Sequence, residues 1–508
     1  MKPFLEVEKN RVNYHKHLLR NTVHRSSLLV PRFQNILSNI TFLNHFLLKR
    51  NNQNVIIKIT AMSKIGQLYD SISLKIDQPK VYSFFLEDLF DSHKDIGQYN
   101  IEFFSSQNLF IPFPAVMVNH IGQDFVNSVH SYNRLLNDVF EDDQVNDQHV
   151  LESSVDIFID DNHDTFFNFM TGPFDIEGTL GLSLKYKREN LNSNKKIKLK
   201  RLTNKNFYLS KDFRSEGDNS KLLQFKNLED EVNPILRISQ PKQKLFYGRM
   251  LSGIIHKKTK AFSANHTYHE SSKFKEYFDN SESFRTYPYF KNCKNQIKMY
   301  PIMSPSKIEV YVEVYDDKRK YISESKYITS PSNESIYFDI DQIVSDANFK
   351  NTTLYKIFAK SVNGKIPTRV THQLIYGSEN SVSKLDCSIA INLANKKIFK
   401  PKSKKGLCWG QVLCDKEYRS FLGLSFNDHH SKPEVVKIDF YNRSGKLKSI
   451  KRTIHPKQSL ILNDSFFHKI NTKSEFIWFI AASGRSDLSA KIFHFNKISN
   501  NASGEHSF

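Results

Sequence analysis

A short ending that recurs along the chain is the feature that most constrains its fold. The last stretch reads FIWFIAASGRSDLSAKIFHFNKISNNASGEHSF, which is a strand, a turn at Ser483-Gly484, a second strand and a close on His506-Ser507-Phe508. The same order occurs three times upstream, ending on His130-Ser131-Tyr132, His266-Thr267-Tyr268 and Cys387-Ser388-Ile389. A period of about 100 residues is too long for a solenoid repeat. We therefore expect tandem β-sandwiches, whose usual size it matches.

Two further elements precede each ending in a similar order. The first is a pair of strands around a turn, clearest in IEVYVEVYDDKRKYISESKYI and in VVKIDFYNRSGKLKSIKRTI, where apolar and polar residues alternate as in half-buried strands. The second is an aromatic strand that ends near an acidic residue, as in YSFFLEDLF, FYLSKDF and SIYFDIDQI. The repeated order indicates about four related units.

The composition supports strands over helices. The chain has 41 Phe and 22 Tyr but only 17 Gly among 508 residues, and aromatic side chains fit a pleated, half-buried surface. A chain of this length is also too long for a single core. The predicted fold class is mostly β, with about four sandwich-like units packed in pairs. Helical spacing of apolar residues from Pro31 to Leu48 predicts a small helical or irregular N-terminal segment in addition.

These patterns give an expected domain organisation. The expected ranges are 1–53 for an N-terminal arm or helix, 54–136 for the first β unit, 137–165 for an acidic linker, 166–270 for the second unit, 271–306 for a connector, 307–392 for the third unit, 393–433 for a basic linker with strands, and 434–508 for the fourth unit.

Charge is distributed unevenly along the chain. The net charge is +20, yet residues 1–180 carry 15 Lys and Arg against 22 Asp and Glu. The remainder of the 73 basic and 53 acidic residues, 58 against 31, gives the rest of the chain a net charge of +27. Such asymmetry suggests binding of a polyanion, or docking of one part of the chain on the other.

The recurring histidines are the candidate catalytic residues. Alternation along a strand places His130, His266 and His506 on one face, and histidine serves both acid–base catalysis and metal ligation. The alternative interpretation is a structural histidine that bonds a neighbouring turn and recurs because the units are related. The cysteine at the corresponding place in the third unit favours the structural interpretation.

Two basic runs are the candidate binding residues for a polyanion. They lie near Phe207, Tyr208 and Phe399, and cations interleaved with aromatic residues are typical of sites that follow an anionic backbone. Solvated loops of a lysine-rich protein are the competing interpretation. The residues of the two runs are Lys195, Lys196, Lys198, Lys200, Arg201, Lys396, Lys397, Lys402, Lys404 and Lys405.

Neither a cofactor nor a metal is expected. Asp160, Asp161 and Asp164 offer the oxygen ligands that a divalent cation prefers, but they lack the EF-hand spacing and read better as a solvated linker. The chain has no P-loop, no G-x-S-x-G and no H-E-x-x-H motif. The four cysteines, the start without an apolar signal region and the short apolar runs lead us to expect a cytoplasmic protein without a membrane span.

Three functions are compatible with these observations. The first is a non-catalytic binding or scaffolding protein whose basic, aromatic surface holds a polyanionic partner, an anionic glycan or a nucleic acid. The second is a hydrolase or carbohydrate-active enzyme with a cleft lined by His and Asp. The third is a structural subunit that forms homo-oligomers through edge strands. The first is our expectation, because no catalytic motif is present.

Overall fold

The structure is a computed structural model of the 508-residue chain. The residues that it describes are 2–3, 24–90, 95–105, 115–130, 132, 148–172, 175–186, 189–212, 235–243, 249–269, 276–279, 281–300, 304–316, 319–323, 326–328, 335–381, 383–394, 406–427 and 432–508. They form two compact halves, an N-terminal half (Lys9–Ser271) and a C-terminal half (Ser272–Phe508 with Met1–Glu8).

Each half contains two copies of one eight-stranded β-sandwich. In every copy the strand order of the first sheet is first, sixth, third and fourth, and the order of the second sheet is fifth, second, seventh and eighth. All neighbouring strands in these sheets are antiparallel. The described part of the chain therefore confirms a mostly β fold with four related units, grouped in pairs; we call them repeats 1 to 4.

Repeat 1 includes a short helix, α2 (His45–Arg50), after its second strand. Its strands are β2 (His24–Pro31), β3 (Leu37–Leu43), β4 (Val55–Met62), β5 (Leu68–Lys75), β6 (Val81–Phe85), β7 (Gln98–Ser105), β8 (Met117–Ile121) and β9 (Val126–Val129).

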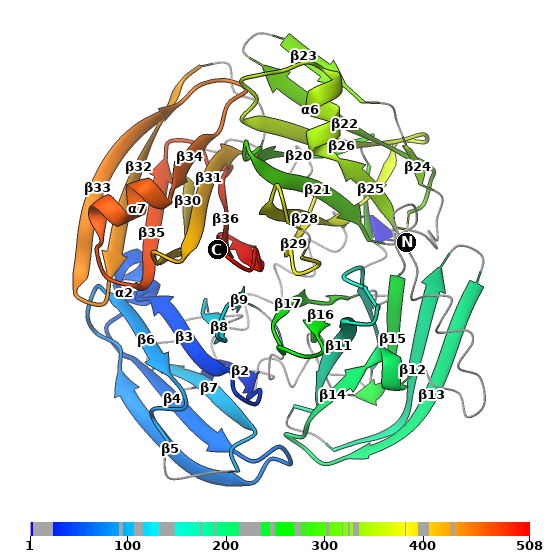
Figure 1. Ribbon diagram of the computed structural model, residues 1–508, viewed down its shortest axis with the longest axis vertical. Coiled ribbons are helices and arrows are strands. Elements are labelled where there is room, and N and C mark those ends of the chain that lie inside the picture. Colours follow the sequence, from blue (N-terminus) through cyan, green and yellow to red (C-terminus); the bar gives the residue numbers. More distant parts are fainter. Residues whose placement is uncertain are drawn as a thin grey trace. The chain divides into compact units, whose positions relative to one another are not determined.

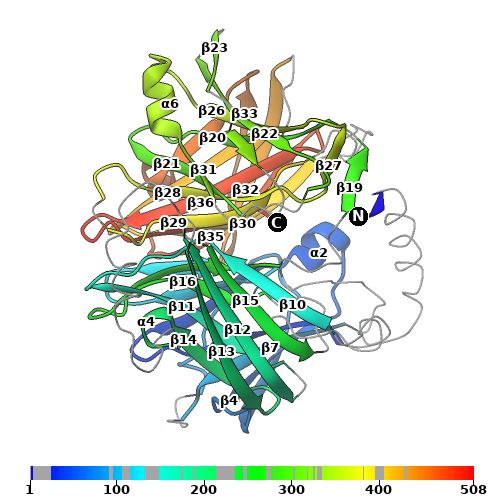
Figure 2. The same cartoon turned by 90° about the vertical axis from the view of Figure 1, so that its right-hand side faces the viewer.

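Repeat 2 has one helical turn, α4 (Leu209–Asp212), after its fifth strand, and a two-residue strand, β18 (Tyr268–His269), that pairs with β10. Strands β10, β15, β12 and β13 lie side by side (Figure 2). The eight main strands are β10 (Gln148–Ser154), β11 (His163–Met170), β12 (Ile176–Tyr186), β13 (Glu189–Leu199), β14 (Asn204–Tyr208), β15 (Ile235–Gln243), β16 (Leu251–His256) and β17 (Phe262–His266).

Repeat 3 has helix α6 (Ile340–Asp346) after its fifth strand and an additional strand, β24 (Lys326–Ile328), on β22. A small separate sheet joins β1 (Lys2–Pro3), β19 (Glu276–Asp279) and β27 (Lys365–Pro367). The main strands are β20 (Glu282–Pro288), β21 (Cys293–Met299), β22 (Ile308–Asp316), β23 (Arg319–Ile322), β25 (Ile336–Asp339), β26 (Leu354–Ser361), β28 (Thr371–Ser378) and β29 (Cys387–Asn392).

Repeat 4 has helix α7 (Asp464–Ile470) in the same place. Its two sheets are named here the β33 sheet (β30, β35, β32, β33) and the β36 sheet (β34, β31, β36, β37), and the strands of the first lie side by side in Figure 1. The strands are β30 (Gly406–Cys414), β31 (Tyr418–Phe426), β32 (Glu434–Asn442), β33 (Gly445–Ile454), β34 (Leu460–Asn463), β35 (Glu475–Ser483), β36 (Leu488–Asn496) and β37 (Ala502–His506).

The first two strands of repeats 1, 3 and 4, and the first strand of repeat 2, lie outside the ranges expected for the β units. Strand β3 and the short α2 occupy the segment for which a helix over Pro31–Leu48 was predicted, so the helix is confined to α2. The range expected as an acidic linker contains β10 and the start of β11, and the range expected as a connector contains β20 and β21. The range 393–433, expected as a basic linker with strands, contains β30 and β31. Strands β3 and β11 lack a clear alternation of apolar and polar residues, because all but one residue of each are buried.

The two repeats of the C-terminal half share one hydrophobic core. Phe493, Phe495 and Ala502 of repeat 4 belong to the same buried cluster as the interior of repeat 3. The Phe290 ring of repeat 3 lies 4.8 Å from the Phe493 ring, centroid to centroid. A side chain at Gly423 would place its Cβ only 2.6 Å from Pro288, so the close approach of the two repeats requires glycine there.

Candidate functional site

Two of the histidines that end the repeats, His266 and His506, share a local hydrogen bond. The ring nitrogen Nδ1 of His266 lies 3.1 Å from the carbonyl oxygen of Thr267, and Nδ1 of His506 lies 2.8 Å from that of Ser507. A carbonyl only accepts hydrogen bonds, so Nδ1 carries the proton in both rings. At His266, Nε2 then accepts from the Arg249 guanidinium at 3.2 Å. This recurring bond to the next residue agrees with the structural interpretation of the histidines.

The three histidines are divided between the halves. His130 and His266 are buried in the N-terminal half, where their ring centroids lie 5.7 Å apart with the planes at 78°. His506 ends β37 in the C-terminal half. The alignment of Cys387 with these residues is wrong, because Cys387 begins β29, whereas His266 and His506 are the last residues of their strands. Apolar spacing alone did not show the offset.

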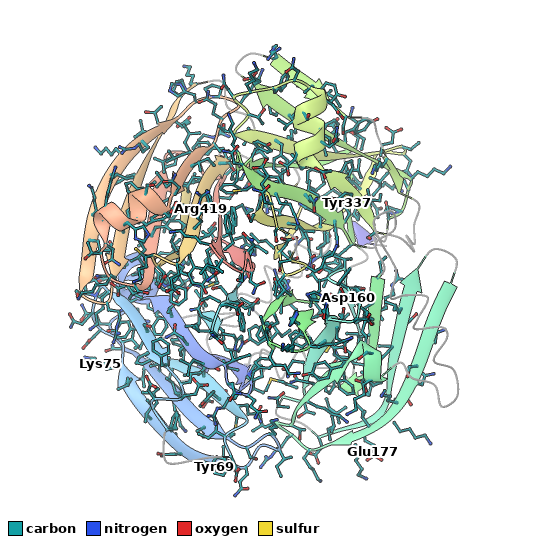
Figure 3. The ribbon with its side chains drawn as sticks, viewed as in Figure 1. Tyr69, Lys75, Asp160, Glu177, Tyr337 and Arg419 are labelled. Carbon is teal, nitrogen blue, oxygen red and sulfur yellow. The ribbon has the colours of Figure 1, made fainter. Side chains whose placement is uncertain are left out.

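The acidic residues proposed as metal candidates bind protein groups. Asp160, in the loop before β11 (Figure 3), accepts hydrogen bonds from the backbone of Asn162 and His163 and contacts the His163 ring. Asp164 accepts from the backbone and hydroxyl of Ser210. Among the described residues, Asp160, Asp161 and Asp164 do not form a group of three with ligand atoms within 4.8 Å of one another. Their arrangement is that of a turn.

The first basic run is largely matched by carboxylates. Lys195 pairs with Asp212 at 2.5 Å, Lys198 with Glu177 at 3.1 Å, and Lys200 with Asp175 at 3.0 Å. The backbone N–H of Arg201 also bonds Asp175. The lysines lie on β13, the fourth strand of repeat 2, or just after it. Local pairing lowers the positive potential available to a partner. Of the second run, Lys396, Lys397, Lys402, Lys404 and Lys405 lie outside the described residues.

The fourth strand of each other repeat also carries cations at the edge of its sheet. In repeat 1, Lys75 on β5 pairs with Asp77 at 3.4 Å. In repeat 3, Arg319 on β23 pairs with Asp316 at 2.7 Å, and Lys320 pairs with Glu313 at 3.4 Å. Cations on an edge strand are a common protection against unwanted strand pairing.

Repeat 4 departs from this pattern on β33. Lys448, Lys451 and Arg452 are exposed, and none has a carboxylate within 4.0 Å in the described part of the chain. The register places Lys451 directly opposite Lys437 on β32. Like charges in that position destabilise a pair of strands. An arrangement that costs stability in the free protein is a candidate for binding an anion.

One carboxylate lies among these cations. Asp439 is 3.3 Å from Lys437 and 3.0 Å from Lys446. Burial acts to raise the pKa of Asp439, but hydrogen bonds from Ser449, Lys446 and Lys437 outweigh burial and hold the pKa below its usual value. Asp439 therefore stays charged and neutralises part of the positive charge at one end of β33. At the other end Lys451 keeps its charge on this face, whereas Lys448 and Arg452, opposite the buried Phe440 and Val436, are exposed on the other side of the same edge strand.

Apolar and aromatic side chains continue the same face of the β33 sheet. The pairing registers put Leu407 and Ala482 in line with Lys437 and Lys451, and they put Trp409 and Ile480 in the next line with Asp439. Leu407, Trp409, Ile480 and Ala482 are each partly exposed. Val435, at the outer end of β32, is 55% exposed. We call this surface, from Leu407 and Trp409 across to Lys451, the β33 face.

The last residue of the chain packs on this face. Phe508 stacks on Trp478 with ring centroids 6.0 Å apart and planes at 5°, and its centroid lies 6.2 Å from that of Trp409. Its N–H donates to the Trp409 carbonyl at 2.9 Å. Phe508 is only partly buried, because the chain leaves β37 and crosses to the edge of β30. It extends the aromatic part of the β33 face.

Sequence reasoning did not single out Lys448, Lys451 and Arg452. The segment GKLKSIKRTI was recognised as a strand, and its cations looked like those of any solvated edge. These three cations differ from those of the other edge strands because no acidic residue lies opposite them. That difference can be seen only once the register between β32 and β33 is known.

The chain matches no model of a known protein family and has no significant match among curated proteins. Within the described residues, no helix has the length and apolar character needed to cross a bilayer.

Proposed function

We propose that the protein is a non-catalytic binding protein that holds an anionic glycan on the β33 face of repeat 4. The observation that carries the proposal is the difference between the edge strands. Cations on β5 and β23, and most of those on β13, are paired with carboxylates, whereas Lys448, Lys451 and Arg452 on β33 are exposed without one. Such cations attract polyanions by releasing their counterions.

The rest of the face favours a glycan over a nucleic acid. Nucleic acids bind sheet surfaces through aromatic rings whose open faces stack on successive bases. On the β33 face, Trp409 and Trp478 already stack with Phe508, and the neighbouring side chains Leu407, Ile480 and Ala482 are aliphatic. The apolar C–H faces of sugar rings pack on such a strip, while Lys451 and Lys437 lie beside it to meet sulfate or carboxylate groups.

The same cations argue against assembly through this edge. A second copy of β33 would bring Lys448, Lys451 and Arg452 against like charges, which opposes pairing of edge strands. We therefore favour a binding role over the structural-subunit alternative.

The test is charge reversal on β33 in the full-length chain. In the triple variant K448E/K451E/R452E, we expect the affinity for heparin to fall by about tenfold or more, and the slope of log K against log salt to fall by about 2 to 3. The matched control is K196E/K198E/K200E on the edge of repeat 2, which makes the same change of charge. Its affinity should change by less than about twofold.

Two outcomes would contradict the proposal. Equal loss in the two triple variants would mean that heparin responds only to total charge. Retention of heparin binding by the β33 variant would place any site elsewhere. A single-stranded oligonucleotide and polyglutamate serve as competing polyanions, and tighter binding of either than of heparin would overturn the choice of a glycan.

A further inference from the structure

The contact between repeats 3 and 4 contains a buried lysine that the β33 face does not involve. Lys491 lies on β36 and is only 1% exposed. Its Nζ donates to the carbonyl oxygen of Ala490 at 3.3 Å and lies 5.4 Å from the centre of the Tyr287 ring. Within the described residues it has no carboxylate partner within 4.0 Å, so two of its three N–H groups lack an acceptor from the protein.

A second cation, Arg285 on β20, belongs to the same cluster. Its guanidinium donates to the hydroxyl of Tyr287, and that hydroxyl lies 2.7 Å from Nε2 of His372. The Nε–H of Arg285 is buried and has no acceptor in the described part of the chain. Burial without an acceptor is costly for any N–H group and most costly for a charged one.

The remaining neighbours offer little negative charge. Burial, and after it the charge of Arg285, lowers the pKa of Lys491 to about 7, while Cys408 and Glu505 act in the opposite direction with smaller effects. Burial raises the pKa of the Cys408 thiol to about 12, so this group is neutral at pH 7. Burial lowers the pKa of His372 to about 3, so this ring is neutral as well. His506 is the cross-strand partner of Lys491.

We propose that Lys491 and Arg285 bind a small oxyanion, phosphate or sulfate, between repeats 3 and 4. The free N–H groups of the two cations supply the charge-assisted hydrogen bonds that such an anion requires. Part of the Arg285 residue is exposed although its Nε–H is buried, so the cluster lies close beneath the surface of the C-terminal half. The bound charge would also keep Lys491 protonated. This site lies on different strands from the β33 face and does not depend on the function proposed for that face.

Equilibrium dialysis of the full-length chain with labelled phosphate, at about pH 6.5 and fixed ionic strength, tests the proposal directly. We expect one phosphate per chain in the wild type and none in K491M, with reduced affinity in R285Q. The matched control K446M removes an exposed lysine of the β33 sheet and should keep the wild-type stoichiometry. The triple variant K448E/K451E/R452E should keep it too, which separates this site from the surface proposed for glycans.

Thermal unfolding supplies a second readout. Replacing chloride by sulfate should raise the melting temperature of the wild type by a few degrees more than that of K491M, because a ligand stabilises only the state that binds it. Sulfate keeps its charge over the relevant pH range, so its effect should fade as Lys491 loses its proton above about pH 8. Equal effects on both proteins would reflect general exclusion of sulfate from protein surfaces and would overturn the proposal. Unchanged phosphate stoichiometry in K491M would overturn it as well.

Discussion

Lys491 shows how a single residue can set the pH dependence of stability. Its pKa is about 7 in the folded protein and near 10.5 when the chain unfolds. Between these values the unfolded chain binds more protons, so the free energy of unfolding rises with pH in that window. Below about pH 7 the lysine is charged in both states, and its buried charge lowers stability by the full amount.

We expect K491M to remove this dependence. In chloride buffer at about pH 6 the variant should be more stable than the wild type by on the order of 4 kcal/mol, and the difference should vanish near pH 10. Guanidinium unfolding at several pH values measures it, with K446M as the exposed control. If the free energy of unfolding of the wild type instead falls between pH 7 and pH 10, the pKa of Lys491 is not lowered in the folded protein.

At this scale the sequence was least informative. LSAKIFHFN reads as a strand with one lysine, and an exposed lysine is the ordinary expectation. Lys491 is buried because repeat 3 covers this face of β36, and packing between repeats leaves no mark on local alternation. Lys451 differs from other edge lysines only through its partner in the register, Lys437.

The short helices after the fifth strands differ in how they begin. In α6 the side chain of Asp339 accepts a hydrogen bond from the backbone N–H of Gln342 at 3.0 Å, which caps the first turn. In α7 the corresponding residue, Asn463, makes no such bond. The two helices therefore provide a matched pair of positions.

We expect D339A to lower the free energy of unfolding by about 1 kcal/mol, because the substitution removes the acceptor of the Gln342 backbone N–H. N463A should change it by only a few tenths of a kcal/mol, because no cap is removed. Denaturant unfolding of both variants measures the difference. Equal destabilisation would mean that the cap of α6 contributes nothing beyond helix propensity.

The elements that were predicted correctly are those with one solvated face. The pairs β32–β33 and β35–β36 alternate or end in clear turns, and their positions follow from the sequence. The second strands of repeats 1 to 3 were missed or misplaced. Every residue of β11 after the first is buried, as is nearly every residue of β3, so neither shows period-two alternation. In β3 the apolar residues then fell by chance at helical spacing.

The shared core makes the C-terminal half one folding unit. A fragment of residues Ser272–Phe508 should fold alone and unfold in one cooperative transition, because Phe493 and Phe495 complete the core of repeat 3. A fragment of residues 281–394 should instead expose Phe290 and Tyr376 and bind a hydrophobic dye. Calorimetry and dye binding measure these properties. Two separate transitions in the larger fragment would mean that the repeats are independent.

The strand order also governs what the chain can do while it is being synthesised. In repeat 4, β30 has no partner strand in its own repeat until β35 has left the ribosome, and β31 lacks one neighbour until β36 follows. The first strand of every other repeat waits in the same way for the sixth. Each sandwich must therefore emerge almost whole before either of its sheets can close, a pattern of distant pairing that slows folding. In the C-terminal half the delay is longer still, because repeat 3 completes its core only when Phe493 and Phe495 of repeat 4 have emerged.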